Sequence, residues 1–236
     1  QDLKRAPFYQ QLKEVVDWSY EHVTSTLCSC LATHAVMQFK YGQKRQAVGA
    51  KHWGVFPHKV VNRVHPLVKG VNTRFDIPHS RFNEISEFQF AKAEVEVLAK
   101  SPIGVHLAVS PDLFRIVFFQ GHPEYDAISL LKEYKREVAL YLENNGTEYP
   151  PIPSNYLSLQ SQAILEEYRT KLDSKKTSIA DFPEALITNK LDNTWHDSAN
   201  AIINNWIGCV YQITNEDIAK PFMDGIDPNN PLKLKK

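Results

Sequence analysis

The stretch HVTSTLCSCLATHAVMQFKYG, residues 22–42, constrains the fold most because a short strand passes directly into a helix within it. Its first part, HVTSTLC, is rich in β-branched residues, which favour strands, and is short enough to be a buried one. Leu31, Ala35 and Phe39 then recur at a spacing of four, and Gly42 gives a helix stop. A strand, a tight turn and a helix in this order are typical of an α/β sheet.

The rest of the chain alternates between strand-like and helix-like segments. A first helix is predicted before residue 22, with Pro7 in its first turn and an apolar stripe of Phe8, Leu12, Val15 and Val16. Strands are predicted at 51–60, 95–101, 104–111 and 113–121, and the nearly continuous apolar run of the last favours a central strand covered on both faces. Further helices are predicted from 126 to a stop at Asn144–Gly146, over 160–174 and over 198–213.

Charge and cysteine content exclude several classes of protein. Lysine and arginine number 27, as do aspartate and glutamate, so no basic stripe for nucleic acid is present apart from the closing KLKK. No apolar run approaches the roughly 20 residues of a membrane span. Three cysteines are too few, and odd in number, for a disulfide framework. These features predict a reduced, cytoplasmic protein that binds neither nucleic acid nor membrane.

The two cysteines of CSC differ in their predicted surroundings. Cys28 lies within the strand, where a thiol only fills space, whereas Cys30 lies where the strand turns into the helix. The turn projects a side chain out of the sheet, and a helix N-terminus stabilises a thiolate. CSC has no further ligands at zinc-site spacing, so no metal site is predicted. From this segment alone, core packing of both cysteines is the favoured interpretation, and a nearby base would change it.

GHPEYD, residues 121–126, offers such a base. It follows the apolar strand and precedes a helix, at the carboxyl end of a strand where α/β sheets place their chemistry. His122 and Glu124 are separated by one residue, so both project to one side of an extended backbone. On its own the pair would pass for a loop histidine beside a capping acid. Together with Cys30 it favours a Cys–His–Glu catalytic site.

The chain resembles the homoserine O-succinyltransferase and O-acetyltransferase enzymes of methionine biosynthesis. The matching stretches are WSYEHVTSTLCSCLA, YG, GVFPHKV, HPLVKG, FDIPHSRF, GHPEYD with its helix, and NNWIGCVYQIT. The resemblance implies a flavodoxin-like three-layer α/β/α fold related to class I glutamine amidotransferases. It also implies an acyl-CoA co-substrate, either acetyl-CoA or succinyl-CoA, with no bound cofactor, and a homodimer.

By the same resemblance, Cys30 is the acyl-accepting nucleophile, His122 the general base and Glu124 its partner. Lys51, Ser80 and Arg136 fall at positions that contact substrate, although periodicity alone would leave Arg136 solvated. The backbone N–H of Leu31 is expected in the oxyanion hole.

Two departures from the family pattern shape the expected organisation. The family carries a long N-terminal portion that supplies the first strands of the sheet, so part of the domain is expected upstream of Gln1. The charged stretch LQSQAILEEYRTKLDSKK is predicted to be an inserted helix, with a solvated peripheral helix as the favoured interpretation. We therefore predict a catalytic domain at 1–150, a connector with an inserted helical segment at 151–197, and a helix and tail at 198–236 that pack on the catalytic domain.

Other functions stay open. A serine acceptor would place the same chemistry in cysteine synthesis, and nothing in these residues excludes it. A glutamine amidotransferase-like hydrolase uses the same residue types, but such enzymes usually carry the pattern G-x-C-x-G around their cysteine. Here Ser29 and Leu31 flank Cys30, and Cys28 and Ala32 stand at the two glycine positions. An inactive scaffold ranks below both because all three candidate catalytic residues are present.

Overall fold

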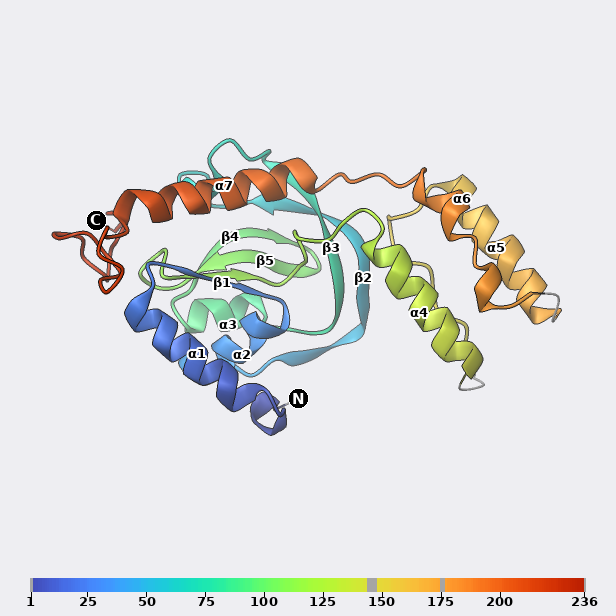
Figure 1. Ribbon diagram of the computed structural model, residues 1–236, viewed down its shortest axis with the longest axis horizontal. Helices are drawn as coiled ribbons and strands as arrows, with labels where there is room; N and C mark the ends of the chain where they lie inside the picture. The colour runs from blue at the N-terminus through green and yellow to red at the C-terminus, as the bar shows by residue number, and fades with distance from the viewer. Residues whose placement is uncertain (1, 144–147, 175–176, 236) are drawn as a thin grey trace.

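The computed structural model describes residues 2–143, 148–174 and 177–235, and its centre is a six-stranded sheet (Figure 1). The strand order is β1-β6-β5-β4-β2-β3. The strands span β1 Thr26–Ser29, β2 Gln46–Val60, β3 Arg74–Glu84, β4 Glu96–Ser101, β5 Gly104–Val109 and β6 Ile116–Phe119. Among the named strands of the described ranges, β1 and β6 are parallel, and the other neighbours are antiparallel.

Helices cover both faces of the sheet and give it a layered arrangement (Figure 1). One side carries α1, α2 and α3, the other carries α7, and α4, α5 and α6 gather beyond β2 and β3. The helices span α1 Tyr9–His22, α2 Leu31–Tyr41, α3 Glu87–Lys92, α4 Ser129–Glu143, α5 Leu159–Asp173, α6 Glu184–Thr188 and α7 His196–Ile213, with 3-10 turns η1 Leu3–Arg5, η2 Pro66–Val68 and η3 Ile179–Asp181. Within the described ranges, no helix is both long and apolar enough to cross a membrane.

The central strand β6 shows why the sheet needs cover on both sides. Ile116 and Phe118 join the core beneath α1, α2 and α3, whereas Val117 and Phe119 join the core that α4 and α7 cover. Alternate side chains of a strand point to opposite faces of the sheet, so a fully apolar strand must be covered on both faces. The predicted central position of this strand is therefore confirmed.

The sequence missed β3 and misplaced one face of α1. Strand β3 carries Pro78 and several charged residues, which hide its alternation, and it lies at one end of the strand order, where proline is tolerated. On α1 the buried residues include Tyr9 and Val16, while Val15 is 61% exposed, so its assignment to the core stripe was wrong. The predicted helix stop at Asn144–Gly146 lies outside the described residues.

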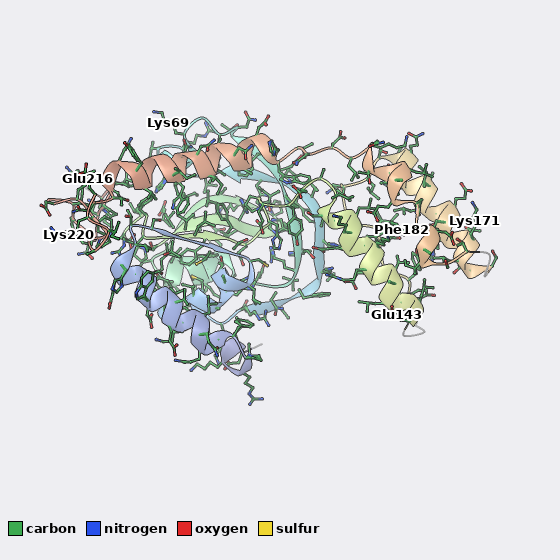
Figure 2. The ribbon with its side chains drawn as sticks, in the orientation of Figure 1. Lys69, Glu143, Lys171, Phe182, Glu216 and Lys220 are labelled. Carbon is green, nitrogen blue, oxygen red and sulfur yellow. The ribbon has the colours of Figure 1, made fainter. Side chains whose placement is uncertain are left out.

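The charged stretch after the proline-rich connector forms α5, and its buried face is larger than expected. Leu165 and Tyr168 are buried, and the Tyr168 ring meets Phe182 edge-on with centroids 5.4 Å apart. Phe182 also contacts Tyr134 of α4, and Figure 2 shows it between the helices of this group. The helix is peripheral and most of its residues are exposed, as the favoured interpretation expected, while Leu165 and Tyr168 attach it to its neighbours. The three-part division at 150 and 197 stays a prediction.

A cluster of neutral histidines lies inside the sheet behind the candidate site. His58 Nε2 and His79 Nε2 lie 3.2 Å apart, and Arg81 Nε donates to His79 Nδ1 over 3.2 Å. Since Arg81 can only donate, His79 must carry its proton on Nε2 and donate it to His58. Both nitrogens of buried His106 lack a hydrogen-bond partner among the described residues. Burial lowers the pKa of His58 to about 4 and holds those of His79 and His106 well below their ordinary value.

These histidines predict a steep loss of stability in acid. An unfolded histidine takes up a proton near pH 6.5, whereas His58 in the fold does so only near pH 4. The contribution of each such histidine to the free energy of unfolding is therefore complete above pH 6.5. It falls by about 1.4 kcal/mol per pH unit as the pH drops below that value. Urea unfolding at a series of pH values measures the slope. His106→Leu should make it shallower and the exposed His196→Asn should not, so an equal slope in all three proteins would contradict this account.

Candidate active site

Cys30 occupies a sharp turn between β1 and α2. Its backbone has φ 47° and ψ −105°, an uncommon conformation for a residue other than glycine, and its N–H donates to Phe119 O over 2.8 Å. This turn resembles the strand–nucleophile–helix elbow of hydrolases, in which a strained residue projects its side chain beyond the sheet. Cys28, on the strand itself, is 4% exposed, and burial raises the pKa of its thiol to about 12. The structure therefore separates the two thiols as the sequence predicted.

His122 follows β6, the parallel neighbour of β1, and its backbone is held in place by close packing against β3. Its N–H donates to Pro78 O of β3 over 2.8 Å. The preceding Gly121 packs so closely that a Cβ there would lie 2.4 Å from Ile77 Cγ2 and 2.8 Å from His79 Nε2. Only glycine fits this approach, which explains the first residue of the GHPEYD motif.

The three predicted catalytic side chains meet at the carboxyl ends of β1 and β6. His122 Nδ1 lies 2.8 Å from Glu124 Oε1, and the Cys30 side chain is close enough to the imidazole to raise its pKa. Ser29 Oγ donates to Glu124 Oε1 over 3.3 Å. Burial opposes the charged ring, but the hydrogen bonds with Cys30 and Glu124 outweigh it and raise the pKa of His122 to about 9. The interactions with the sulfur and the carboxylate thus favour the charged form of the ring.

Glu124→Gln should lower the pKa of His122. The variant keeps the shape of the side chain and removes the negative charge that favours the imidazolium, so its midpoint should fall by about one pH unit or more from the value near 9. A histidine NMR titration of each protein measures both midpoints. The exposed Glu21→Gln is the control and should leave the titration unchanged. A His122 midpoint that stayed in place in Glu124→Gln would show that Glu124 does not set the charge of the ring.

A small cavity of about 170 Å³ opens beside the nucleophile. Its lining residues are Cys30, Leu31, His34, Arg45, Ser80, Arg81, Phe82 and Asn83. Leu31 is the first residue of α2, and the first N–H groups of a helix have no partner within it. A carbonyl on Cys30 would therefore meet backbone donors at the helix N-terminus.

His34 forms one wall of the cavity as a neutral ring. Gln120 Nε2 donates to Ile85 O and Val105 O, so its Oε1 must be the atom that receives the hydrogen bond from His34 Nε2, 3.1 Å away. Burial lowers the pKa of His34 to about 4. The protein therefore holds this histidine uncharged at neutral pH, unlike His122.

Glu133 of α4 joins several groups that the sequence did not connect. Its Oε2 accepts from Ser80 Oγ at 2.6 Å and from Trp53 Nε1 at 3.1 Å, and its Oε1 accepts from Tyr125 Oη at 2.6 Å. The Tyr125 ring stacks on His122 with centroids 4.3 Å apart. Glu133 thus orients both Ser80 and Tyr125, whose ring packs against the imidazole of His122. Helical periodicity places a charged residue on a helix face but does not identify its partners, so the sequence carried no signal for this role.

The remaining predicted substrate residues lie around the site at different distances. Ser80 lines the cavity beside Cys30. Lys51 lines a second hollow that shares Phe82 with the first, and its Nζ lies 3.8 Å from the centre of the Trp53 ring. Burial lowers the pKa of Lys51. Arg136 is 63% exposed on α4, pairs with Glu137 and is absent from the lining of both hollows, so the structure does not bring it to Cys30.

No group of three or more histidine, cysteine or acidic side chains in the described ranges is arranged to hold a metal ion. The chemistry available here is instead that of a thiol, an imidazolium, a carboxylate and a helix N-terminus. This set suits nucleophilic attack on an acyl carbon followed by acyl transfer.

Comparison with known proteins gives one consistent result. A family model described as homoserine O-succinyltransferase matches residues 1–216. Curated homoserine O-succinyltransferases from Nitrosococcus oceani and Thioalkalivibrio nitratireducens are 60% and 59% identical over 99% and 100% of this chain. The chain spans about two thirds of the length of these relatives, 66% and 67% respectively.

Among solved structures, a glutamine amidotransferase from Methylobacillus flagellatus shares the architecture. It is 14% identical, with a TM-score of 0.50 over 88% of this chain and 71% of its own. At that identity the likeness concerns the fold alone. It confirms the predicted flavodoxin-like α/β class of the glutamine amidotransferases, here with an antiparallel extension of the sheet.

Proposed function

This chain belongs to the homoserine O-succinyltransferase family, and we propose that it transfers a succinyl group from succinyl-CoA to the hydroxyl of L-homoserine in methionine biosynthesis. The observation that carries the proposal is the contact chain Cys30–His122–Glu124 at the ends of two parallel strands. Succinyl rather than acetyl is proposed because the curated relatives are named for succinyl transfer.

In the first half-reaction the Cys30 sulfur attacks the thioester carbonyl. The carbonyl oxygen gains negative charge, and the backbone N–H of Leu31 at the start of α2 stabilises it. As the tetrahedral intermediate collapses, the bond to the CoA sulfur breaks and the His122 imidazolium gives that sulfur its proton. CoA leaves, a succinyl thioester remains on Cys30, and His122 is neutral.

In the second half-reaction the neutral His122 acts as a base. It removes the proton of the homoserine hydroxyl while that oxygen attacks the thioester on Cys30; the bond from the acyl carbon to the Cys30 sulfur then breaks, which releases the O-succinyl ester and leaves Cys30 as a thiolate. Glu124 holds the ring through Nδ1 and stabilises the imidazolium that forms again. The kinetics should be ping-pong, since CoA departs before the acceptor reacts. Ser80, held by Glu133, and Lys51 are proposed to position the amino acid, and Arg136 to grip its carboxylate after a rearrangement of its exposed side chain.

A direct assay tests this function. The protein is mixed with succinyl-CoA alone, and intact-mass spectrometry should show one added succinyl group. L-Homoserine should then release it as the O-succinyl ester. Release by L-serine in preference would move the reaction to the other acceptor, and an acyl-enzyme formed only from acetyl-CoA would replace the donor. Ammonia released from glutamine, with no acyl-enzyme from either CoA ester, would favour the glutamine amidotransferase-like alternative, and inactivity throughout would favour a scaffold. A cytoplasmic setting and a homodimer remain proposals with this function.

A further inference from the structure

We infer that Ser80 and Glu133 together recognise the ammonium group of the acceptor amino acid. In this arrangement the Ser80 oxygen accepts a hydrogen bond from the ammonium, and the Glu133 carboxylate supplies negative charge behind it. The inference rests on the proposed transferase function and adds to it the residues that select an amino acid over a simple hydroxy acid. Its basis is the direction of the hydrogen bonds that converge on Glu133.

The Ser80 hydroxyl has no proton left for a substrate. A hydroxyl carries one hydrogen and two lone pairs, and Ser80 Oγ donates its hydrogen to Glu133 Oε2 over 2.6 Å. The indole N–H of Trp53 can only donate, and it donates to the same Oε2 over 3.1 Å. Glu133 Oε2 is thus an acceptor for both side chains. The Ser80 oxygen can therefore only accept a hydrogen bond from a molecule in the cavity.

Ser80 lies beside the reacting centre, and Glu133 lies behind Ser80. Ser80 and Cys30 line the same cavity, whose volume of about 170 Å³ is well below the roughly 300–1,000 Å³ of pockets for drug-sized ligands. An acceptor that reaches an acyl group on Cys30 therefore lies close to Ser80. Trp53 and Ser80 are directly opposite each other on β2 and β3, so their side chains leave the same face of the sheet and meet one carboxylate of α4.

Among the polar groups of L-homoserine, the ammonium is the one that fits this oxygen. The carboxylate has no hydrogen to donate, and the proton of the hydroxyl goes to His122 as its oxygen attacks the acyl group. The ammonium has three donors, and a hydrogen bond from a charged donor is stronger than one between neutral groups. A hydroxy acid without an amine would leave the Ser80 oxygen without a donor.

Charge favours the ammonium at Ser80 over other positions in the cavity. The lining, as far as the described residues form it, includes no aspartate or glutamate, and its two arginines, Arg45 and Arg81, repel a cation. Glu124 is engaged with the imidazole of the base. Ser80 instead has the Glu133 carboxylate directly behind its oxygen. The negative charge of Glu133 therefore attracts the ammonium to this oxygen.

The test follows the second half-reaction with three acceptors. The acyl-enzyme is formed with succinyl-CoA, CoA is removed, and release of the succinyl group is timed with L-homoserine, 3-aminopropan-1-ol or 4-hydroxybutanoate. The second acceptor lacks the carboxylate, and the third lacks the ammonium. Each protein is judged by the ratio of its rates with these acceptors, so a general loss of activity cancels.

Ser80→Ala and Glu133→Gln should each slow both amine acceptors by about 10- to 100-fold relative to 4-hydroxybutanoate, which is the loss expected for a hydrogen bond to a charged group. In Glu133→Gln the amide oxygen must take the place of Oε2, because the Trp53 N–H can only donate. Ser80 then keeps the direction of its hydrogen bond, and the variant removes the charge alone.

Three further variants serve as controls on the ratio of rates. Ser80→Thr keeps the hydroxyl and should recover most of the ratio that Ser80→Ala loses. Tyr125→Phe removes the hydrogen bond to the other oxygen of Glu133 and should leave the ratio unchanged. Glu143→Gln removes an exposed charge from the end of the same helix and should also leave it unchanged.

Each opposite outcome counts against the inference. A larger loss with 4-hydroxybutanoate than with 3-aminopropan-1-ol would mean that Ser80 binds the carboxylate, and an unchanged ratio in Ser80→Ala would mean that it binds neither group. If release is too slow to time, or if the unmodified protein forms no acyl-enzyme and the proposed function fails, binding decides the inference. NMR titration should then show that Ser80→Ala and Glu133→Gln weaken binding of L-homoserine but not of 4-hydroxybutanoate. No binding of L-homoserine to the unmodified protein would overturn the inference.

Discussion

Cys30→Ala is expected to abolish the acyl-enzyme and lower turnover by about 10⁴-fold or more, because no other group at the site can form the thioester. The reason is geometric. Cys30 alone of the cysteines stands at the strand–helix turn, where its side chain interacts with His122. The fold should persist, since the Cys30 side chain is only partly buried and makes no capping hydrogen bond to α2. Intact-mass spectrometry after mixing with succinyl-CoA, together with steady-state rates, measures both effects.

Cys28→Ala is the matched control for this prediction. It removes a thiol of the same strand whose ionisation burial suppresses, so the acyl label should persist and turnover should stay within about tenfold, with a stability cost of about 1 kcal/mol. Serine variants sharpen the contrast. An acyl label that persisted in Cys30→Ser but vanished in Cys28→Ser would show that Cys28 is the nucleophile and would overturn the mechanism.

His122→Asn is expected to lower turnover by about 10³-fold, through both half-reactions. The amide can hydrogen-bond Glu124 but can neither protonate the departing CoA sulfur nor accept the proton of the homoserine hydroxyl. Rapid-mixing experiments separate the two steps: release of CoA reports acylation, and release of the acyl-enzyme by homoserine reports deacylation. Both rates should fall.

Tyr125→Phe serves as the control for His122. It keeps the ring that stacks on the imidazole and removes only the hydroxyl that donates to Glu133, so the loss should stay below about tenfold. Two results would remove His122 from its role as acid and base. One is a His122→Asn protein that retains turnover within tenfold of the original, and the other is a Tyr125→Phe protein that loses as much as His122→Asn.

Local patterns of residues predict much of the fold. The apolar run at β6 had to be covered on both faces, and the β-branched stretch before CSC had to be a strand, because burial of those side chains is possible in few other ways. Strand β3 was not predicted, because Pro78 and charged residues interrupt its alternation of apolar and polar side chains. Its position at one end of the sheet also makes such a regular alternation less necessary. The error at Val15 arose because α1 packs on one narrow stripe, and periodicity alone cannot fix which residues of a broad apolar face are covered.

Local residue patterns alone place a cysteine between a strand and a helix, and a histidine and a glutamate after another strand, because these are facts of order along one segment. Assembly of the sheet makes these segments parallel neighbours, which brings sulfur, imidazole and carboxylate together and raises the pKa of the imidazole. The same assembly places Glu133 beneath Ser80. Contacts between segments distant in sequence depend on how the sheet is assembled, and no local pattern of residues encodes them.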